Sequence, residues 1–435
     1  MKKYLYLIAA MGLLVACQQG GETPELDTTE LWPAGIDHKV PHGFNMETDD
    51  IFPDSALYGY INRQGKMVIP PRFVSAGTFS CGYAPIYEKV ARSESKGAYL
   101  DRNGKVHQIP SDFSLRPEPF YYNIATANYY SVISSSNYPY TEFMIDRNMN
   151  ILVKADREER IYPMTKDGIA LSYKNNKITW YNRSGAKIYQ PEGSCEDPYF
   201  KDGYIVMINK ENNVPIYHIV DTRGYIWYKD SLPLTNIGYR RFLRHHETSF
   251  SEEQYDVIDM NGKPVGSPDF AGLEPKEEMQ IRVRHTHDDQ VLRGMPTYYY
   301  INQDGKQTIP HSYWQASSFH EGYAHVGEDI SSDPDAYVWA EKIINTKGET
   351  VLQFAEGQRL ESIHNGLVLI SEYVDGLNAS RYTYMDLTGK VVYTWLVVYL
   401  QNSDNSPARG AKAKGDPSIR VYPEGQFVLG APENE

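Results

Sequence analysis

The chain has 435 residues of ordinary globular composition, 41% hydrophobic and 23% charged, but 36 of them are tyrosine against 14 phenylalanine and 6 tryptophan. Aromatic residues suit the half-buried face of a sheet, and 26 prolines and 33 glycines add frequent turns, so an all-β protein is expected. The formal net charge of −13 excludes the basic surface that nucleic-acid binding requires.

Residues 1–16 have the layout of a bacterial export signal. The opening MKK precedes an apolar run that is too short for a typical membrane span and ends in LVAC at residues 14–17. This ending resembles the lipobox of bacterial lipoproteins, in which cleavage leaves the cysteine as the first residue. The resemblance implies lipidation of Cys17 by two or three acyl chains, which anchor stably where a single chain is marginal. A plain secretory signal with an incidental cysteine is the alternative.

The rest of the chain divides into a tether, a repeat region and a tail. Residues 17–45 hold the lipidated cysteine and a polar, acidic sequence with Gly and Pro that is typical of a flexible tether. Residues 46–400 hold the repeats, and the stretch VVYTWLVVYL (391–400) is too short to span a membrane and predicts a buried strand. Residues 401–418 have the composition of a low-complexity linker, and residues 419–435 predict a hairpin or a closing strand.

One stretch of eleven residues occurs twice in similar form, as YINRQGKMVIP at 60–70 and as YINQDGKQTIP at 300–310. Their shared element is an apolar residue, then Asp or Asn, two free positions and Gly. Counting one imperfect copy, the element occurs nine times, and from Gly65 to Gly389 there are 324 residues over eight intervals, a mean of 40.5. A period of this size is the signature of a solenoid, a propeller or another repeat array.

Each copy of the element predicts a tight turn between two short strands. Asp or Asn at its first position hydrogen-bonds to the backbone two residues on, and Gly three positions later takes the left-handed conformation that a Cβ disfavours. The predicted turn pairs are Asn62 and Gly65, Asp101 and Gly104, Asn182 and Gly185, Asp221 and Gly224, Asp259 and Gly262, Asn302 and Gly305, Asn345 and Gly348, and Asp386 and Gly389.

One of the nine copies departs from the pattern. Asp146 is in place, but Met149 stands where the glycine should be. A bulky side chain disfavours the left-handed conformation. We therefore expect that Asn148 or Asn150 supplies the left-handed residue, or that this turn has a different length.

The better copies carry a Pro, an aromatic residue and a second apolar strand after the turn, which gives three or four short strands per repeat. Such a sheet is marginal alone, whereas stacked neighbours share a core. We expect an all-β array of about nine β-hairpin or meander repeats of ~40 residues each. A propeller-like ring is favoured over an open β-superhelix, although nine blades are one more than an ordinary ring has.

Residues 58–86, YGYINRQGKMVIPPRFVSAGTFSCGYAPI, resemble the WG repeat, a bacterial repeat named for a Trp-Gly pair before the hairpin. Tyr58-Gly59 stands in the place of that pair, and residues 297–326 match next best. The resemblance implies a binding or interaction platform. Together with the signal, it implies a lipid-anchored protein of the bacterial cell envelope, at the outer membrane and facing the periplasm or the surface.

The sequence contains no cofactor-binding motif and no catalytic motif such as Gly-x-Ser-x-Gly, so no cofactor is expected. His285 and His287 share a face if they lie on a strand, which makes them weak candidate metal ligands. His320 and Glu321 begin the sequence HEGYAH, which resembles the helical zinc motif. Its histidines are five rather than four positions apart and fall in a strand region, so no metal is expected there.

Cys81 and Cys195 lie in different registers of repeats three apart. A disulfide between them stays open as an alternative to buried free thiols, which are expected because the registers differ.

Two functions from different classes are compatible with the sequence. The first is a non-catalytic platform that binds a protein or a glycan, with tyrosines that stack on sugars or anchor an interface. The second is a propeller-type extracytoplasmic hydrolase with its active site at the central mouth, which a converging set of carboxylates or of His and Asp would favour. The platform is favoured because no catalytic motif is present, and its expected partners are the membrane, through the lipid on Cys17, and an unknown protein or glycan.

Overall fold

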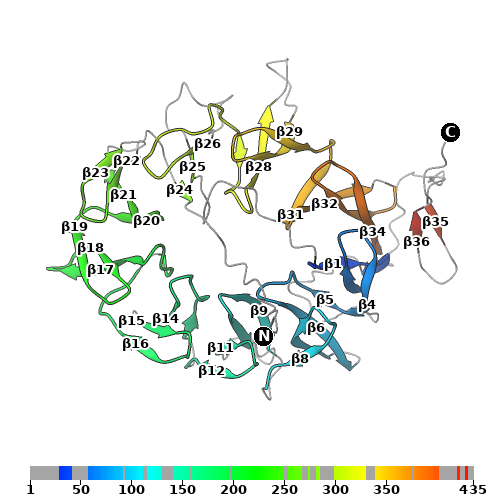
Figure 1. Ribbon diagram of the computed structural model, residues 1–435, viewed down its shortest axis with the longest axis horizontal. Helices are drawn as coiled ribbons and strands as arrows, with labels where there is room; N and C mark the ends of the chain where they lie inside the picture. The colour runs from blue at the N-terminus through cyan, green and yellow to red at the C-terminus, as the bar shows by residue number, and fades with distance from the viewer. Residues whose placement is uncertain are drawn as a thin grey trace, which may run out of the picture.

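A computed structural model describes residues 29–41, 57–91, 94–110, 115–129, 141–156, 159–175, 177–195, 197–247, 253–266, 273–274, 281–284, 298–329, 339–374, 376–400, 419–421 and 427–429. These residues form strands and turns, and the all-β prediction is confirmed. Within them there is no helix long and apolar enough to cross a membrane. Nine sheets of three to five strands follow one another along the described chain, and in Figure 1 they are arranged in a propeller-like ring.

The nine sheets are numbered here in chain order, and the strands of each are named in the order in which they are hydrogen-bonded to one another. Sheet 1 consists of β1 (Trp32–Gly35), β3 (Tyr58–Ile61) and β4 (Met67–Phe73). Sheet 2 consists of β5 (Ser75–Ala76), β6 (Tyr83–Ala91), β7 (Glu94–Asp101) and β8 (Val106–Gln108). Sheet 3 consists of β9 (Arg116–Tyr121), β10 (Ile124–Tyr129), β11 (Thr141–Asp146) and β12 (Ile151–Lys154).

The next three sheets continue the same order. Sheet 4 consists of β13 (Arg160–Ile161), β14 (Ile169–Lys174), β15 (Lys177–Asn182) and β16 (Lys187–Tyr189). Sheet 5 consists of β17 (Tyr204–Glu211), β18 (Val214–Asp221) and β19 (Ile226–Asp230). Sheet 6 consists of β20 (Leu234–Gly238), β21 (Arg241–Glu247), β22 (Glu253–Asp259) and β23 (Pro264–Gly266).

The last three sheets complete the series. Sheet 7 consists of β24 (Leu273–Glu274), β25 (Ile281–Arg284) and β26 (Tyr298–Ile301). Sheet 8 consists of β27 (Gln315–Ala316), β28 (Tyr323–Asp329), β29 (Trp339–Asn345) and β30 (Thr350–Gln353). Sheet 9 consists of β31 (Gln358–His364), β32 (Leu367–Val374), β33 (Ala379–Asp386), β34 (Val391–Leu400) and β2 (His38–Pro41). The tail forms a separate two-stranded sheet of β35 (Ile419–Val421) and β36 (Phe427–Leu429).

The structure has a turn of one geometry at each of the nine predicted positions. The side-chain oxygen of the Asp or Asn accepts hydrogen bonds from the backbone N–H groups two and four residues on, as Asn62 Oδ1 does at 3.1 and 3.0 Å. The residue at the glycine position has a φ between 64° and 84° throughout. Met149 itself adopts this conformation, with a φ of 64°, so the expectation that Asn148 or Asn150 would supply it is wrong. The Met149 side chain is buried in the core between sheets 2 and 3, and this packing offsets the backbone strain.

These turn glycines also make room for the neighbouring sheet. Tyr189, on the outermost strand of sheet 4, lies on Gly224 of sheet 5, where an added Cβ would come within 2.7 Å of the Tyr189 ring. Further contacts of this kind are made by Ile69 at Gly104, Leu152 at Gly185, Tyr228 at Gly262, Ile309 at Gly348, Leu352 at Gly389 and Val392 at Gly65. The contact of Val392 at Gly65 joins sheet 9 to sheet 1.

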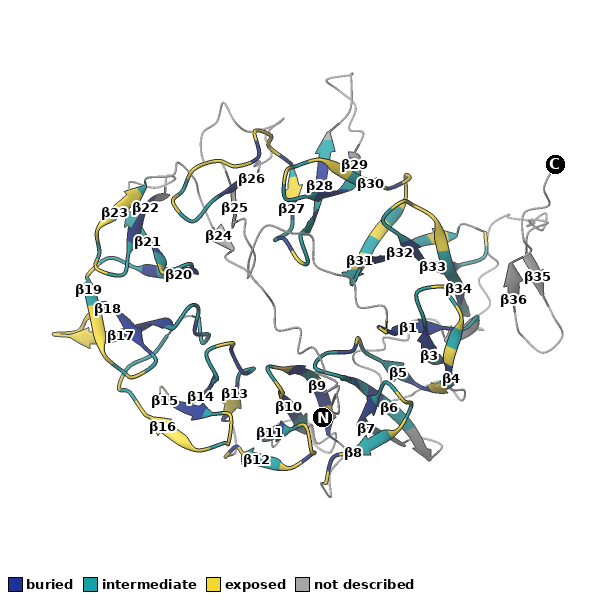
Figure 2. Cartoon of the chain, viewed as in Figure 1, coloured by how far each residue is buried: buried dark blue, intermediate teal, exposed yellow. Residues whose placement is uncertain are grey.

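The hydrophobic core of the described residues is divided into nine clusters, each between two successive sheets. Figure 2 shows the buried residues on the strands within each sheet and the exposed ones at the outer edge. The cluster between sheets 9 and 1 contains Trp32, Ile61 and Trp395, so the last sheet packs against the first. Segments from near the beginning and near the end of the described chain therefore share this cluster.

The predicted tether ends earlier than expected. Residues 29–41 fall within the range 17–45 that the sequence assigned to it, yet β1 pairs with β3 in sheet 1 and β2 pairs in parallel with β34 in sheet 9. The physical reason is Trp32, whose side chain is 1% exposed and lies in the core between these two sheets. The polar and Gly/Pro-bearing sequence around it concealed this contribution.

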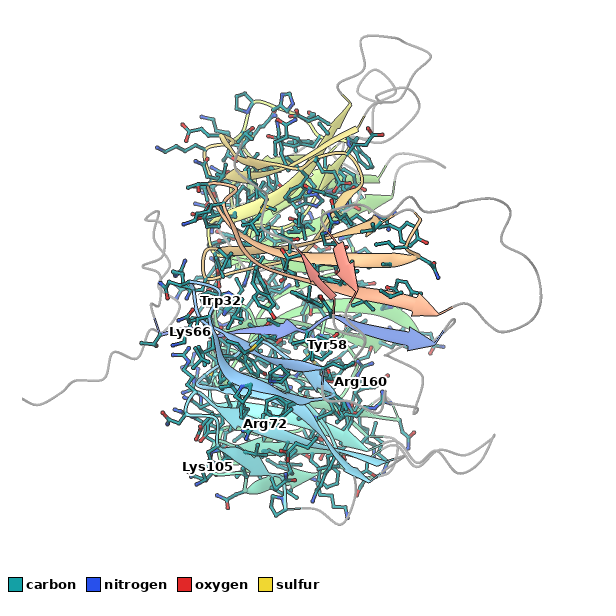
Figure 3. The ribbon with its side chains drawn as sticks, turned by 90° about the vertical axis from the view of Figure 1, so that its right-hand side faces the viewer. Trp32, Tyr58, Lys66, Arg72, Lys105 and Arg160 are labelled. Carbon is teal, nitrogen blue, oxygen red and sulfur yellow. The ribbon has the colours of Figure 1, made fainter. Side chains whose placement is uncertain are left out.

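The repeated turns lie on one face of the molecule. Lys66 and Lys105, which follow the turn glycines of sheets 1 and 2, lie toward the same side of Figure 3, and Arg160 lies toward the other. A second, inner set of turns joins the first two strands of most sheets and lies on this same face, because the strand that follows it pairs with the repeated turn, as Tyr323 does with Asn345. We call this side the turn face.

Candidate functional site

Large exposed apolar side chains gather on the outermost strands of sheets 4, 5 and 6 and on the turn that precedes β19 in sheet 5. Of the eleven such side chains in the described part of the chain, six lie there: Ile188, Tyr189, Tyr225, Ile226, Trp227 and Val265. We call these six residues the rim patch. Figure 2 shows the exposed segments β16 and β23 in yellow, and the outer edges of β16, β19 and β23 pair with no other described strand.

The most prominent part of the rim patch is an aromatic pair at the turn of sheet 5. A register shift opposite Ile219 and Val220 leaves Trp227 at a β-bulge, and its side chain is 39% exposed. Tyr225 is 61% exposed, and its ring meets the Trp227 ring edge-on with a centroid separation of 5.3 Å. A bulge re-aims a side chain relative to the regular strand, which accounts for the outward position of this tryptophan.

Asp221 holds the aromatic pair beside a cationic group. Its Oδ2 accepts hydrogen bonds from Arg223 Nε and Nη2 at 3.1 and 2.7 Å and from Trp227 Nε1 at 3.4 Å. Burial opposes ionisation of Asp221, but the hydrogen bonds from Arg223 and the backbone outweigh it and lower the pKa of this carboxyl. The Arg223 side chain is 76% exposed. The turn therefore presents an arginine and two aromatic rings that are already positioned by one carboxylate.

A partly buried cluster of histidine and carboxylate side chains lies on the turn face where sheets 8 and 9 meet the N-terminal segment. His364 Nδ1 is 3.0 Å from Glu321 Oε1, and His364 Nε2 is 3.5 Å from Glu30 Oε1. His320 Nε2 is 3.8 Å from the same oxygen of Glu321. Arg102, in the turn of sheet 2, donates a hydrogen bond to the other oxygen of Glu30. We call His320, Glu321, His364 and Glu30 the histidine cluster.

The charge state of the histidine cluster bears on the hydrolase alternative. Burial lowers the pKa of His364, but the hydrogen bonds and charges of Glu30 and Glu321 outweigh it and raise this pKa to about 9. Burial by itself would raise the pKa of Glu321. The hydrogen bond from His364 and the charges of His364 and His320 outweigh burial, so the pKa of Glu321 is lowered. A histidine that is protonated at neutral pH cannot accept a proton as a general base. His364 in this state is therefore not the general base of a hydrolase.

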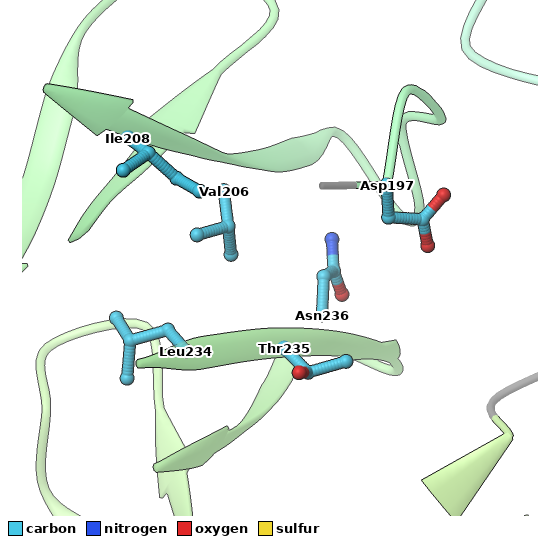
Figure 4. A pocket seen from close by; sticks show the side chains of 6 residues that line it. All are labelled: Asp197, Val206, Ile208, Leu234, Thr235 and Asn236. Atoms are coloured by element: carbon cyan, nitrogen blue, oxygen red, sulfur yellow. The ribbon is translucent and has the colours of Figure 1, made fainter. Parts of the chain in front are cut away.

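A small cavity lies between sheets 5 and 6, and Figure 4 shows its six lining side chains. It has a volume of about 140 Å³ and is lined by Asp197, Val206, Ile208, Leu234, Thr235 and Asn236. Two of its polar lining residues are already engaged by Lys201, whose Nζ lies 2.6 Å from Asp197 Oδ2 and donates to the Asn236 carbonyl. Ligand pockets usually measure about 300–1,000 Å³, so this cavity is too small for an ordinary ligand.

The structure separates several candidates that the sequence placed together. His320 and Glu321 lie beside His364, whereas His325 Nε2 contacts Glu341 Oε2 at 2.9 Å. Sequence reasoning missed His364 and Glu30, because neither lies near the HEGYAH stretch in the chain. Cys17, His285 and His287 lie outside the described residues.

The two described cysteines are free thiols. Cys81 and Cys195 are both half-buried, and no disulfide joins them. Burial, reinforced by the charge of Asp197, raises the pKa of Cys195 to about 12. A thiol in this state is a poor nucleophile.

Two stretches of the chain, residues 58–89 and 300–329, match the family model described as WG containing repeat. No curated protein matches the chain. Among solved structures, the crystal structure of the eukaryotic initiation factor is similar over 81% of this chain and 96% of that chain, with 10% identity and a TM-score of 0.52. A similarity at this identity shows the fold alone.

Two peptidase structures are also similar. The Pyrococcus horikoshii acylaminoacyl peptidase matches over 64% of this chain and 51% of that chain, with 8% identity and a TM-score of 0.39. A structure from a study of two prolyl endopeptidases matches over 76% and 54%, with 9% identity and a TM-score of 0.36. Similarities this low support no conclusion about activity.

The protein is propeller-like and built from β-sheet repeats. Three features define it: the repeated turns, the cores shared by successive sheets, and the side chains that lie on the turn glycines of the neighbouring sheet. Each family match begins in the outer hairpin of one sheet and ends in the inner hairpin of the next. Residues 58–89 and 300–329 of this propeller-like chain are similar to the WG repeat.

Proposed function

We propose that this protein is an envelope-anchored lipoprotein whose propeller-like WG-repeat domain is a non-catalytic binding platform. The rim patch is the observation that carries the proposal. Trp, Tyr and Arg dominate the binding energy of protein interfaces, and Tyr225, Trp227 and Arg223 are exposed together. Because Asp221 already holds two of them, binding loses less side-chain entropy than it would with unrestrained side chains.

A protein is the partner that the rim patch favours over a glycan. The patch continues over the outer strands of three neighbouring sheets, and the outer edge of β19 (Ile226–Asp230) is paired with no described strand. An extended segment of a partner can pair with such an edge while its side chains contact the patch. Tyr225 and Arg223 also offer the ring and the polar group that a sugar needs, so a glycan is the alternative outcome of the test.

The lipid anchor is part of the same proposal. Cys17 follows Leu-Val-Ala, the described fold begins at residue 29, and the polar stretch between them would tether the platform to the outer membrane. Uptake of a radioactive fatty acid by the whole chain, and none by Cys17→Ser, is the expected result. Equal labelling of the two chains would rule out this anchor.

Capture of a partner from an envelope extract by the immobilised whole chain tests the platform, with a glycan array as the second arm. We expect the double variant Tyr225→Ala/Trp227→Ala to lose capture by roughly a hundredfold or more, because each anchor of this kind contributes ~2 kcal/mol. Tyr373→Ala is the matched control, because Tyr373 is 57% exposed but lies on sheet 9, outside the patch. Undiminished capture by the double variant would show that the partner binds elsewhere.

A further inference from the structure

We propose that His320, Glu321 and His364 form a binding site for one divalent transition-metal ion of the zinc type. Each of the three offers one ligand atom, and these atoms lie within 4.8 Å of one another. The three come from two elements: His320 and Glu321 from the inner turn of sheet 8, and His364 from the end of β31 (Gln358–His364) in sheet 9. The site goes beyond the proposed binding function, because it lies on the turn face and shares no residue with the rim patch.

The separations of the ligand atoms fit a small metal ion. Zinc binds imidazole nitrogen and carboxylate oxygen at about 2.0–2.2 Å in a tetrahedron, which places neighbouring ligand atoms about 3.3 Å apart. The two measured separations from Glu321 Oε1 are 3.0 Å to His364 Nδ1 and 3.8 Å to His320 Nε2, one on either side of that value. Small rotations of exposed His320 would bring all three atoms to one ion.

The surroundings of His364 provide the second partner that a metal-bound histidine normally has. A ligating imidazole donates its other N–H to a carboxylate, which sets the tautomer and the ring orientation. Zinc on Nδ1 would displace the proton that this nitrogen otherwise directs at Glu321, and His364 Nε2 would keep its own proton facing Glu30 Oε1 at 3.5 Å. Glu30 is 4% exposed, so this oxygen is a buried acceptor directed at the histidine. Its other oxygen is held by Arg102.

Glu321 is positioned in the same way from its other side. Its Oε2 accepts the backbone N–H of Asn365, the first residue of the next inner turn, which leaves Oε1 directed at the two histidines. Two imidazoles and one carboxylate suit zinc and its neighbours in the transition series, whereas calcium and magnesium prefer oxygen ligands. The His320 side chain is 67% exposed, so an ion can enter from the turn face.

A metal here would link three parts of the molecule. Its ligands join sheets 8 and 9, and Glu30 extends the connection to the segment before β1 (Trp32–Gly35), which completes sheet 1. The metal would therefore stabilise the place where the segment before β1 meets sheets 8 and 9.

Zinc titration of the whole chain by calorimetry, after chelator treatment and dialysis, tests the site. We expect one equivalent of zinc to bind wild type, and His320→Ala and Glu321→Gln to lose this binding. Glu30→Gln is expected to weaken binding by about 10–100-fold, as loss of an outer carboxylate does. Cobalt added in place of zinc should show tetrahedral visible absorption in wild type and not in His320→Ala.

The control variant is His311→Ala, because His311 belongs to the same repeat but pairs with Glu328 outside the cluster. It should bind zinc as wild type does. The double variant His285→Ala/His287→Ala should also bind normally. Zinc should raise the melting temperature of wild type and of both controls, and leave that of His320→Ala unchanged.

Three results would overturn the proposal. One is the absence of zinc binding by wild type, which would leave the cluster as a set of ion pairs. Another is loss of binding in His285→Ala/His287→Ala with binding kept in His320→Ala. The third is a zinc-dependent rise in melting temperature that persists in both His320→Ala and Glu321→Gln. His320 is the most exposed ligand, so His320→Ala remains informative if Glu321→Gln fails to fold.

Discussion

At the scale of single residues, the turn glycine serves two physical needs. It adopts a left-handed conformation, and it lets a side chain of the neighbouring sheet lie on the turn, as Tyr189 does on Gly224. Met149 satisfies the first need without being glycine. The outermost strand of the neighbouring sheet 2, β8 (Val106–Gln108), has polar His107 and Gln108 where most other sheets have the large apolar residue that lies on the next turn. Met149 thus fills the core from the turn itself.

The two roles of glycine can be separated by a matched pair of substitutions. Gly224→Ala introduces both backbone strain and a clash with Tyr189, whereas Gly203 has a similar φ of +86° and nothing within 4 Å of an added Cβ. We expect Gly203→Ala to lower the free energy of unfolding by about 1–2 kcal/mol and Gly224→Ala by ~3 kcal/mol or more. Urea unfolding followed by tryptophan fluorescence measures the difference. Equal losses of unfolding free energy would mean that the contact of Tyr189 with Gly224 adds nothing to stability.

At the scale of elements, the inner turns form a second connected series. Six of them place two successive residues at positive φ: Cys81 and Gly82, Tyr122 and Asn123, Asp202 and Gly203, Tyr239 and Arg240, Glu321 and Gly322, and Asn365 and Gly366. Neighbouring turns are then linked side chain to backbone, as Asp202 accepts the N–H of Tyr239 and Glu321 that of Asn365. Such turns have no single sequence pattern, which is why only the outer series was predicted.

The outer turns predict a specific response to acid. The hydrogen bond from the Thr388 side chain has the largest effect on Asp386 and lowers its pKa. Burial opposes it, but the backbone hydrogen bonds of Lys390 and Thr388 add to the lowering, so the pKa of Asp386 lies below its ordinary value. A lowered pKa in the folded state stabilises the fold above the unfolded-state value of about 3.9, and this stability is lost as the pH falls through the folded-state pKa.

We expect Asp386→Asn to reduce the loss of stability between about pH 4 and pH 2, because an amide keeps the acceptor oxygen and does not titrate. Four turns of this chain, including the one at Asn62, already have asparagine at this position. Urea midpoints measured across this range give the result. Asp156→Asn is the control, since the Asp156 side chain is 79% exposed and pairs with Lys174. An unchanged acid profile in Asp386→Asn would contradict the prediction.

At the scale of the whole molecule, the N-terminal segment completes both ends of the array. The first family match begins at residue 58, in the outer hairpin of sheet 1, so the inner strand of that sheet has to come from elsewhere. β1 supplies it, and β2 adds to sheet 9. Trp32 Nε1 donates to the His364 carbonyl at 3.0 Å, and Tyr384 Oη to the Pro33 carbonyl at 2.9 Å, across more than three hundred residues of chain.

Trp32→Ala is expected to loosen the contact between sheets 9 and 1. Removing a buried tryptophan costs about 3–5 kcal/mol through the cavity that it leaves. Hydrogen exchange should rise first in β3 and β34, on either side of the cavity. Trp180→Ala removes an equally buried tryptophan between sheets 4 and 5, and there the rise should be confined to those sheets. The same exchange pattern in both variants would refute a distinct role for the N-terminal segment.

The sequence alone determined the strand-rich class, the spacing of the repeats and the position of every outer turn, because the hydrogen bonds of these turns close within five residues. The tertiary structure decided the features that hydrogen bonds between neighbouring residues cannot determine. Whether Met149 adopts a left-handed conformation depends on the core around its side chain, and Trp32 became part of the fold by packing against a strand near the other end of the chain. The rim patch and the histidine cluster join residues from different sheets, and only the packing of those sheets brings them together.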